Sequence, residues 1–540
     1  MKFLESVWHS AAYRAAVLIL AAAGIASAQS DAEIGGTVRD ASGAVVPGVS
    51  VTVANLETGG VRTTVTNEVG FFVVPLLQPG RYQIRLGKPG FKQVAQSGIT
   101  LQVNEQARLS FVLEVGAVTE EIRVTAPAPL LETATATRGQ VIDNQKIVEL
   151  PLNGRDYLQL ALISAGVGRL PPGGRFETFS ASGQRAQENT YLLDGVDNNS
   201  MQRAAQGRRA EVIKPSVDAI QEFKVMTNAY SAEYGRAAGG VVTVNMKSGT
   251  NEIHGSVFEF LRNEKLDSKN FFDPPGPKPP FKRNQYGFTL GGPIRKDRTF
   301  VFGDYEWTRI RESRTVLNTI PTPAFRSGDF SSLLPGTIVY DPATYDRASN
   351  RRNPFPGNMV PSPRFDPVGS KLAGFYPAPN LPGATRNYIF NPPANEDLNR
   401  FDIRIDHNIS NNDRFFTRYS DSRNPVGATP SLPEPAFGGT TLATPFDHTG
   451  KNLMAGYNRA FSPTFLLELK ASWNELFTVR RAPINYNVNA QLGLKGVELN
   501  DPGMAALYEA YKQGSANACQ EADKRYGKGA CEQMKRKLGF

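Results

Sequence analysis

The stretch Phe401-Asp402-Ile403-Arg404-Ile405-Asp406-His407 alternates apolar and polar residues without a break. Successive side chains of a β-strand point to opposite faces, so this stretch predicts a strand with one apolar and one charged face. Alternating runs of about ten residues with aromatic ends are typical of transmembrane β-barrels, in which apolar side chains face outward. A soluble β-sandwich would show the same alternation, so the choice depends on the flanking sequence.

Six further runs repeat this pattern, at 255–262, 286–292, 300–307, 414–419, 455–460 and 465–473. We therefore predict that residues 251–500 form the N-terminal part of a barrel. Residues 311–397 interrupt the runs with 14 prolines, and proline at that density is excluded from central strands. This segment is predicted to be a long extracellular loop, where binding residues tend to lie. A disordered linker is the alternative.

The N-terminus has the features of an export signal. Lys2 and Arg14 give the start of the chain a positive charge, and an apolar stretch follows over 15–26. Ala26-Ser27-Ala28 is a small-residue cleavage site. Residues 1–28 are therefore predicted to be a signal peptide. A membrane anchor is disfavoured, because about 12 apolar residues cannot span about 30 Å of hydrocarbon. Residues after 28 contain no run of 18 apolar residues, so a helical membrane span is excluded.

Composition excludes several other classes of protein. The net charge is +9 with a pI near 9.3, but the charges are scattered, so no nucleic-acid partner is expected. Cys519 and Cys531 both lie in the last 22 of the 540 residues, so the body of the chain is not a disulfide scaffold. Residues 501–540 form an atypical tail with helical character over 504–514 and 518–538. We interpret it as a misjoined end, with a genuine helical extension as the alternative.

No motif for catalysis or cofactor binding is present, so we expect no enzyme activity, no cofactor and no metal. His254, His407 and His448 are far apart in sequence and are interpreted as surface or turn residues. Oxygen-bearing side chains at 194 and 197–199 suggest Ca²⁺ ligands. The spaced acidic loop of a calcium site is missing, however, and an Asp-Gly turn is the preferred interpretation.

Residues 33–115 contain seven short runs with strand character, at 34–39, 49–54, 61–66, 70–74, 82–86, 99–103 and 109–113. Gly- and Pro-containing turns separate them, which indicates a β-sandwich. The segments Gly36-Thr37-Val38-Arg39-Asp40, Asn67-Glu68-Val69-Gly70-Phe71-Phe72 and Leu77-Gln78-Pro79-Gly80-Arg81-Tyr82 resemble the carboxypeptidase regulatory-like domain. The resemblance implies a non-catalytic, prealbumin/Ig-like sandwich that acts as a spacer or, alternatively, binds a ligand.

Residues 128–250 mix a predicted helix over 141–150 with short strands and glycine turns. The motifs Leu150-Pro151-Leu152-Asn153-Gly154-Arg155, Tyr191-Leu192-Leu193-Asp194-Gly195 and Ser231-Ala232-Glu233-Tyr234-Gly235-Arg236 follow in this order. They resemble the plug domain of TonB-dependent outer-membrane receptors, in the Oar-like branch. In that branch a regulatory-like domain precedes the plug, as it does here.

Residues 119–127 separate the sandwich from the plug and are predicted to be a linker. A short extended peptide of this kind suits strand addition to a partner's sheet edge. It resembles the TonB box, the energy-coupling peptide of these receptors. The resemblance implies that an inner-membrane TonB complex binds the following residues: Glu121, Ile122, Arg123, Val124, Thr125 and Ala126.

The sequence thus predicts a mainly β chain with an N-terminal sandwich, a mixed α/β plug and a partial transmembrane β-barrel. The resemblance implies a cell outer membrane receptor, in contact with lipid, that takes up an extracellular ligand with TonB-coupled energy. An oligosaccharide or a peptide is the expected ligand class, and no ligand-binding residue is assigned. About seven barrel strands are visible, so the chain is expected to be truncated. The alternative is a secreted or surface β-sandwich protein for adhesion or carbohydrate binding, without transport.

Overall fold

The computed structural model describes residues 32–116, 121–124, 137–169, 179–200, 210–269, 271, 278–313, 315–427, 429–436, 445–480, 491–493, 507, 517–526 and 531. The predicted signal peptide lies outside the described residues, as do Thr125 and Ala126 of the predicted coupling peptide.

The N-terminal domain is a sandwich of two sheets, which confirms the prediction from the seven runs. Its strands are β1 (Ala32–Asp40), β2 (Ser50–Asn55), β3 (Val61–Val65), β4 (Phe71–Leu77), β5 (Gly80–Gly87), β6 (Gln93–Leu101), β7 (Gln106–Leu113) and β8 (Glu121–Val124). One sheet has the order β4-β1-β7 and the other β3-β2-β5-β6-β8. Val51 and Val53 of β2, and Val49 just before it, are fully buried between the sheets, because alternate residues along this segment face the core.

Strand β8 differs from the sequence-based expectation of a linker. Glu121–Val124 pairs in parallel with β6, with Val94 opposite Ile122 and Ala95 opposite Arg123. The backbone groups of this segment therefore find partners at the edge of the sandwich's own sheet, and the sandwich extends beyond residue 115.

The plug is built on a five-stranded sheet with the order β13-β12-β15-β14-β9. Its elements are β9 (Arg138–Asp143), α2 (Asn144–Glu149), η1 (Tyr157–Ile163), β10 (Val167–Gly168), β11 (Ser180–Ala181), η2 (Ala186–Glu188), β12 (Thr190–Leu193), β13 (Val196–Asp197), η4 (Val217–Ala219), β14 (Ile220–Asn228) and β15 (Val241–Met246). Tyr157, Tyr191 and Phe223 are among the buried residues of its hydrophobic core, which Phe302 of the strand Thr299–Ser313 completes.

The plug helix begins later than the predicted residue 141. Residues 138–143 form strand β9, which pairs with β14. The side chain of Asp143 then accepts a hydrogen bond from the backbone N–H of Lys146, and so caps helix α2 at its N-terminus. The helix ends before Leu150, which precedes Pro151, as predicted.

Seven long antiparallel strands form the third unit, in the order β16-β17-β18-β21-β22-β23-β24. They are β16 (His254–Asn263), β17 (Phe281–Arg295), β18 (Thr299–Ser313), β21 (Pro393–Asn408), β22 (Asp413–Val426), β23 (Phe446–Ser462) and β24 (Phe465–Arg480). All seven predicted runs are confirmed, and the strands are longer than the runs. Within the described residues the sheet is not closed, since its order ends at β16 and β24.

The two faces of this sheet differ as the alternation of residues 401–407 predicts. Asp402, Arg404 and Asp406 are buried, while Ile403 between them is 36% exposed. Other apolar side chains on the sheet's outer face include Val257, Leu469 and Trp473, which are all exposed. Such a face suits lipid, because hydrocarbon chains cover it without hydrogen bonds.

The predicted proline-rich loop contains ordered structure of its own. A two-stranded ladder pairs β19 (Val316–Asn318) with β20 (Tyr388–Phe390). Between them lie α3 (Pro323–Arg326), η6 (Ser331–Leu333), η7 (Pro342–Thr344), η8 (Pro356–Asn358), η9 (Ser362–Arg364) and α4 (Pro367–Phe375). Helices α3 and α4 begin with proline, which suits the first helical turn because that position needs no N–H partner.

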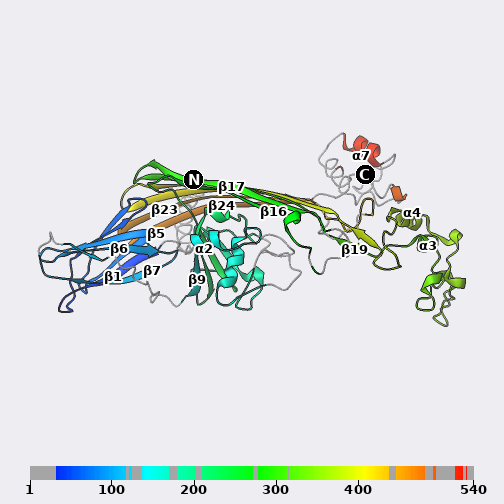
Figure 1. Cartoon of the computed structure of the whole chain (residues 1–540), viewed down its shortest axis with the longest axis horizontal. Coiled ribbons are helices and arrows are strands. Elements are labelled where there is room, and N and C mark those ends of the chain that lie inside the picture. The colour runs from blue at the N-terminus through cyan, green and yellow to red at the C-terminus, as the bar shows by residue number, and fades with distance from the viewer. Residues whose placement is uncertain are drawn as a thin grey trace, which may run out of the picture.

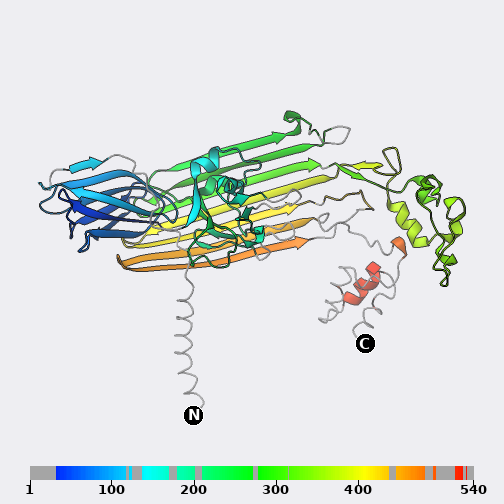
Figure 2. The same cartoon turned by 90° about the horizontal axis from the view of Figure 1, so that it is seen from below.

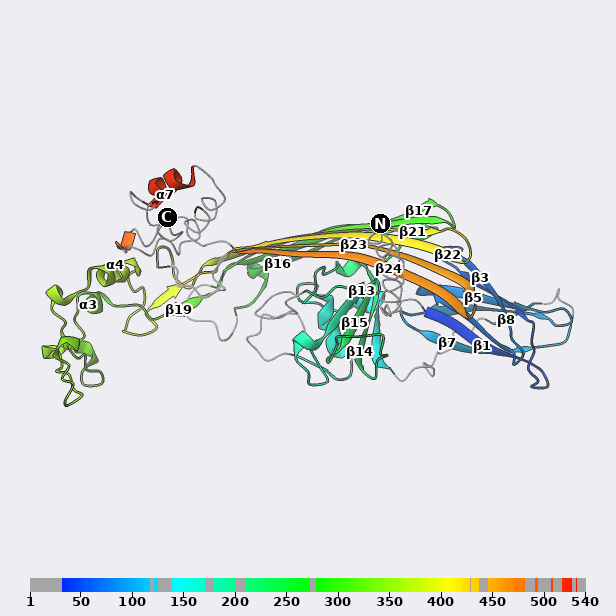
Figure 3. The same ribbon diagram turned by 180° about the vertical axis from the view of Figure 1, so that it is seen from behind.

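Figures 1 and 2 show the sandwich at one end of the long strands and the loop with α3 and α4 at the other end. The plug lies against the concave face of the sheet, between these two ends (Figures 1 and 3). In the tail, helix α7 (Ala518–Tyr526) lies within the predicted helical stretch, and Cys519 forms a disulfide with Cys531. Among the described residues, no helix is long and apolar enough to cross a membrane.

Candidate functional site

The predicted coupling residues that the structure describes form an edge strand of the sandwich. Glu121, Ile122, Arg123 and Val124 pair with residues 93–96 of β6, and the side chain of Arg123 is exposed. The strand stands at the end of its sheet, beyond β6. One edge of the predicted coupling strand is thus already paired with the sandwich.

Asp194 of the plug binds two arginines of the long sheet. Its carboxylate accepts hydrogen bonds from Arg404 Nη1 at 2.9 Å and from Arg418 Nε at 2.7 Å. It also accepts one from the backbone N–H of Met246 at 3.0 Å. The Asp194 side chain is only 4% exposed, so these charges are out of water. Removing one member of such a group lowers the stability of the fold strongly, because the remaining charges stay buried without a partner.

A turn in the plug holds Asp194 in this position. Asp194 and Gly195 join β12 to β13 and have φ angles of +51° and +81°. Two left-handed residues form the hairpin turn for which Asp-Gly is favoured, so the predicted Asp-Gly turn is confirmed. Sequence reasoning missed the role of the side chain, because Arg404 and Arg418 lie more than 200 residues further along the chain. Among the described residues, no cluster of acidic, histidine and cysteine side chains suits a metal.

The ion pairs continue from the plug to the sandwich. Arg404 also donates two hydrogen bonds to Asp406, at 2.8 and 3.0 Å. Asp406 in turn accepts a hydrogen bond at 3.2 Å from the side-chain amide of Gln78, which lies in the sandwich. On the other side, Arg418 donates to Ser420, whose hydroxyl donates to Asp402. One polar network therefore connects the sandwich, the sheet and the plug.

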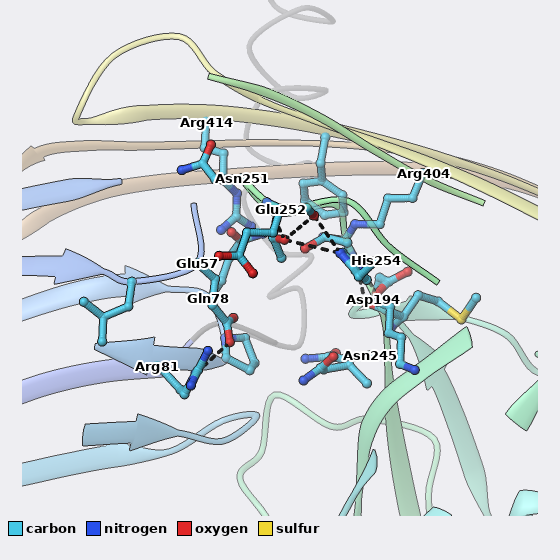
Figure 4. A pocket seen from close by; sticks show the side chains of 18 residues that line it. Glu57, Gln78, Arg81, Asp194, Asn245, Asn251, Glu252, His254, Arg404 and Arg414 are labelled. Carbon is cyan, nitrogen blue, oxygen red and sulfur yellow. Dashed lines mark hydrogen bonds and ion pairs between the residues drawn. The ribbon is translucent and has the colours of Figure 1, made fainter. Parts of the chain in front are cut away.

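A polar cavity of about 380 Å³ lies beside this network, where the three units meet. Figure 4 shows Glu57, Gln78 and Arg81 of the sandwich facing Asp194 and Arg404 across it. The sandwich is also held there by the backbone N–H of Asn251, which donates to the carbonyl of Glu57 at 2.9 Å. The contacts around the cavity are mainly polar, so water can replace them if the domains separate.

The turn after β6 makes a second contact between sandwich and plug. The backbone N–H of Val103 donates to a carboxyl oxygen of Glu222 on β14, and the amide of Asn104 donates to the Tyr234 hydroxyl at 2.6 Å. Burial raises the pKa of Glu222 to about 8, with a further increase from the carboxylates of Glu105 and Asp143. At neutral pH the Glu222 carboxyl is therefore mostly protonated.

Arg155 of the predicted motif at 150–155 makes a further contact between the plug and the long sheet. Its guanidinium forms an ion pair with Asp218 and lies over the rings of Phe258 and Phe260, at 4.9 and 4.1 Å from the ring centres. These two aromatic residues belong to β16. The arginine thus stacks the plug against the sheet through cation–π contacts.

Three family models match the chain over most of its length. Residues 33–114 match the carboxypeptidase regulatory-like domain, and residues 132–242 match the TonB-dependent receptor plug domain. Residues 245–526 match an outer membrane beta barrel domain, which is more than half of the 540 residues.

Two curated proteins show clear similarity in sequence. The TonB-dependent transporter Oar of Myxococcus xanthus is 29% identical over 306 residues, which are 54% of this chain and 28% of that protein. The probable TonB-dependent siderophore receptor PirA of Acinetobacter baumannii is 29% identical over 263 residues, which are 44% of this chain and 32% of that protein. This chain therefore spans about a third or less of the length of these relatives.

Among solved structures, the siderophore receptor PirA from Acinetobacter baumannii matches 65% of this chain and 41% of its own, with 15% identity and a TM-score of 0.40. The ferric enterobactin receptor mutant R480A from Pseudomonas aeruginosa (PfeA) matches 66% and 43%, with 13% identity and a TM-score of 0.40.

Proposed function

This chain belongs to the TonB-dependent outer-membrane receptors, and we propose that it binds an extracellular ligand and moves it inward with energy from the inner-membrane TonB complex. Its location is the outer membrane. In this proposal the plug blocks the path along the concave face of the sheet until the coupling strand is engaged. No catalytic step is part of the proposal.

The observation that carries this proposal is the way in which Asp194 is held by Arg404 and Arg418. Most residues of the apolar core around Tyr157 and Phe223 belong to the plug, and Phe302 of β18 joins them from the sheet, so the plug keeps most of this core if it moves. Apolar side chains of the two units meet where Val196 of the plug packs with Phe416 and Met454 of the sheet. Beside them, directional ion pairs and hydrogen bonds join the plug to the sheet. Such contacts hold a single position firmly, yet water or a new partner can satisfy them after a small displacement.

The ligand is expected to bind first at the end of the sheet that carries the loop, which lies opposite the sandwich (Figure 2). A cavity of about 640 Å³ in the loop is lined by aromatic side chains that include Phe325, Phe330, Phe365 and Tyr376. A pocket of this size and character suits an apolar or aromatic part of a ligand. The class of the ligand stays a prediction. A siderophore is added to the oligosaccharide and the peptide as a third candidate, since one relative is named as a probable siderophore receptor.

The alternative of a surface adhesion or carbohydrate-binding protein without transport does not account for the plug. An adhesion protein has no need of a plug domain that buried ion pairs hold against the concave face of a sheet whose other face is apolar. Fractionation on a sucrose gradient separates the two ideas, because a receptor sediments with the outer membrane and a secreted protein stays in the soluble fraction.

Binding to the periplasmic domain of TonB tests the coupling step. We expect measurable binding for the wild-type receptor, loss of binding for Val124→Pro and a mild effect for Val124→Ala. Proline removes a backbone donor and restricts φ, whereas alanine leaves the main chain free to pair. Equal binding by the wild type and Val124→Pro would show that the segment is not the coupling site.

A further inference from the structure

The strand that carries the predicted coupling residues is already part of a sheet. In the order β3-β2-β5-β6-β8 it is the last strand, and within the described part of the chain no other strand pairs with its outer edge. All four residues of β8 are in register with β6. An edge of this kind is a template for a further strand, because its outward N–H and C=O groups lie in an extended row.

We propose that the sandwich presents β8 to TonB as a preformed edge strand, and that a TonB strand adds beside β8 while β8 stays paired with β6. This inference rests on the proposed function, in which residues 121–126 are the coupling site. It adds that the binding surface is a composite of peptide and sandwich. The sandwich would then be part of the coupling site rather than a spacer.

Addition of a TonB strand beside β8 is favoured over displacement of β8 from β6, because β8 already has a fixed conformation. A free peptide loses conformational entropy at each residue that it fixes on binding, whereas the residues of β8 are fixed before the partner arrives. Displacement would also break the β6–β8 ladder and leave β6 as a new open edge. Addition keeps that ladder and uses backbone groups on the other side of β8.

The position of β8 permits such an approach. Figure 3 shows β8 among the strands of the sandwich, to one side of the plug and at the end of the molecule opposite α3 and α4. Arg123 on β8 is exposed. A partner strand can therefore reach this edge without first moving the plug.

The same arrangement connects the partner to the plug through the sandwich. Strand β6 ends at Leu101, and the turn that follows places Val103 and Asn104 against Glu222 and Tyr234 of the plug. A pull on β8 that does not break the β6–β8 ladder is therefore transmitted to a turn that touches β14. In this view the sandwich transmits force to the plug.

A disulfide between the two strands tests addition against displacement. Ala95 and Arg123 are opposite each other, and paired positions on neighbouring strands lie within the Cα distance of about 4.4–6.8 Å that a disulfide requires. The only native cysteines are Cys519 and Cys531, which pair with each other, so an Ala95→Cys and Arg123→Cys double variant can be oxidised selectively. The probe is the soluble periplasmic domain of TonB, with the two single variants as controls.

We expect the oxidised and the reduced double variant to bind TonB with dissociation constants within about 2-fold of each other. A loss of about 10-fold or more on oxidation, restored by reduction, would show that β8 must leave β6, and would overturn the inference.

A synthetic peptide of residues 117–130 supplies the second measurement. Presentation by the sandwich predicts that the whole chain binds TonB at least about 10-fold more tightly than this peptide, because the peptide must become ordered on binding. Equal or tighter binding by the peptide contradicts the inference. Failure of the proposed function looks different: TonB then binds the wild type and Val124→Pro equally, or binds neither.

Discussion

Replacement of Glu222 by glutamine should change how the stability of the receptor depends on pH. Glu222 lies in the contact between plug and sandwich, and only 6% of it is exposed. Its pKa is raised from 4.5 to about 8, mainly by burial. The charged groups that face it are Glu105 of the sandwich, Asp143 of β9 and Lys224 of its own strand.

The direction of the effect follows from the raised pKa. Below pH 4.5 Glu222 is protonated in both the folded and the unfolded chain, so the folded state is not penalised. Between pH 4.5 and about 8 the unfolded chain releases a proton that the folded chain retains, so the free energy of unfolding falls as the pH rises. Above pH 8 both states are ionised and the loss is complete. At about 1.4 kcal/mol per pKa unit, the loss is on the order of 5 kcal/mol.

Thermal unfolding in detergent between pH 5 and pH 9 measures this effect. We expect the wild type to lose stability over the range, whereas Glu222→Gln should lack this component because glutamine does not ionise and still accepts the hydrogen bond from Val103. The stability of the variant should match that of the wild type near pH 5 and exceed it at pH 9. Glu68→Gln, at an exposed position of the sandwich, is the control. Parallel pH profiles for the wild type and Glu222→Gln would refute the reasoning.

Three further predictions concern the contacts within and between the units. Asp194→Ala should lower the free energy of unfolding by about 3–5 kcal/mol, because it leaves Arg404 and Arg418 buried without their shared carboxylate; urea denaturation should show a much smaller effect for the exposed Asp197→Ala. Gly456→Ala should cost about 1–3 kcal/mol, since an added Cβ would lie 2.2 Å from the buried ring of Phe416, and an unchanged melting temperature would contradict this. Residues 33–115 lack β8 but contain nearly all of the buried core of the sandwich, so this fragment should fold alone as a monomer; a random-coil circular dichroism spectrum would count against it.

Local patterns decided much of the architecture in advance. The alternation at 401–407 and in six similar runs predicted all seven strands of the long sheet, because a period of two is a property of each strand by itself. The seven runs at 34–113 became β1 to β7 for the same reason. The Asp194-Gly195 turn was also readable from sequence, since its two left-handed residues are a local requirement. Its side-chain role was not, because nothing near Asp194 in sequence indicates distant arginines.

Pairing between remote segments was decided only by the tertiary structure. The sequence by itself indicated that residues 121–126 favour an extended conformation, but many sheet edges can accept such a strand. The folded sandwich offers the edge of β6, and Glu121–Val124 occupies it. Likewise, the charged face of β21 was predicted from alternation, whereas its partners Asp194 and Gln78 come from two other domains. Strand propensity and side-chain alternation are local properties of the chain, while the choice of a partner depends on which surfaces the whole fold brings together.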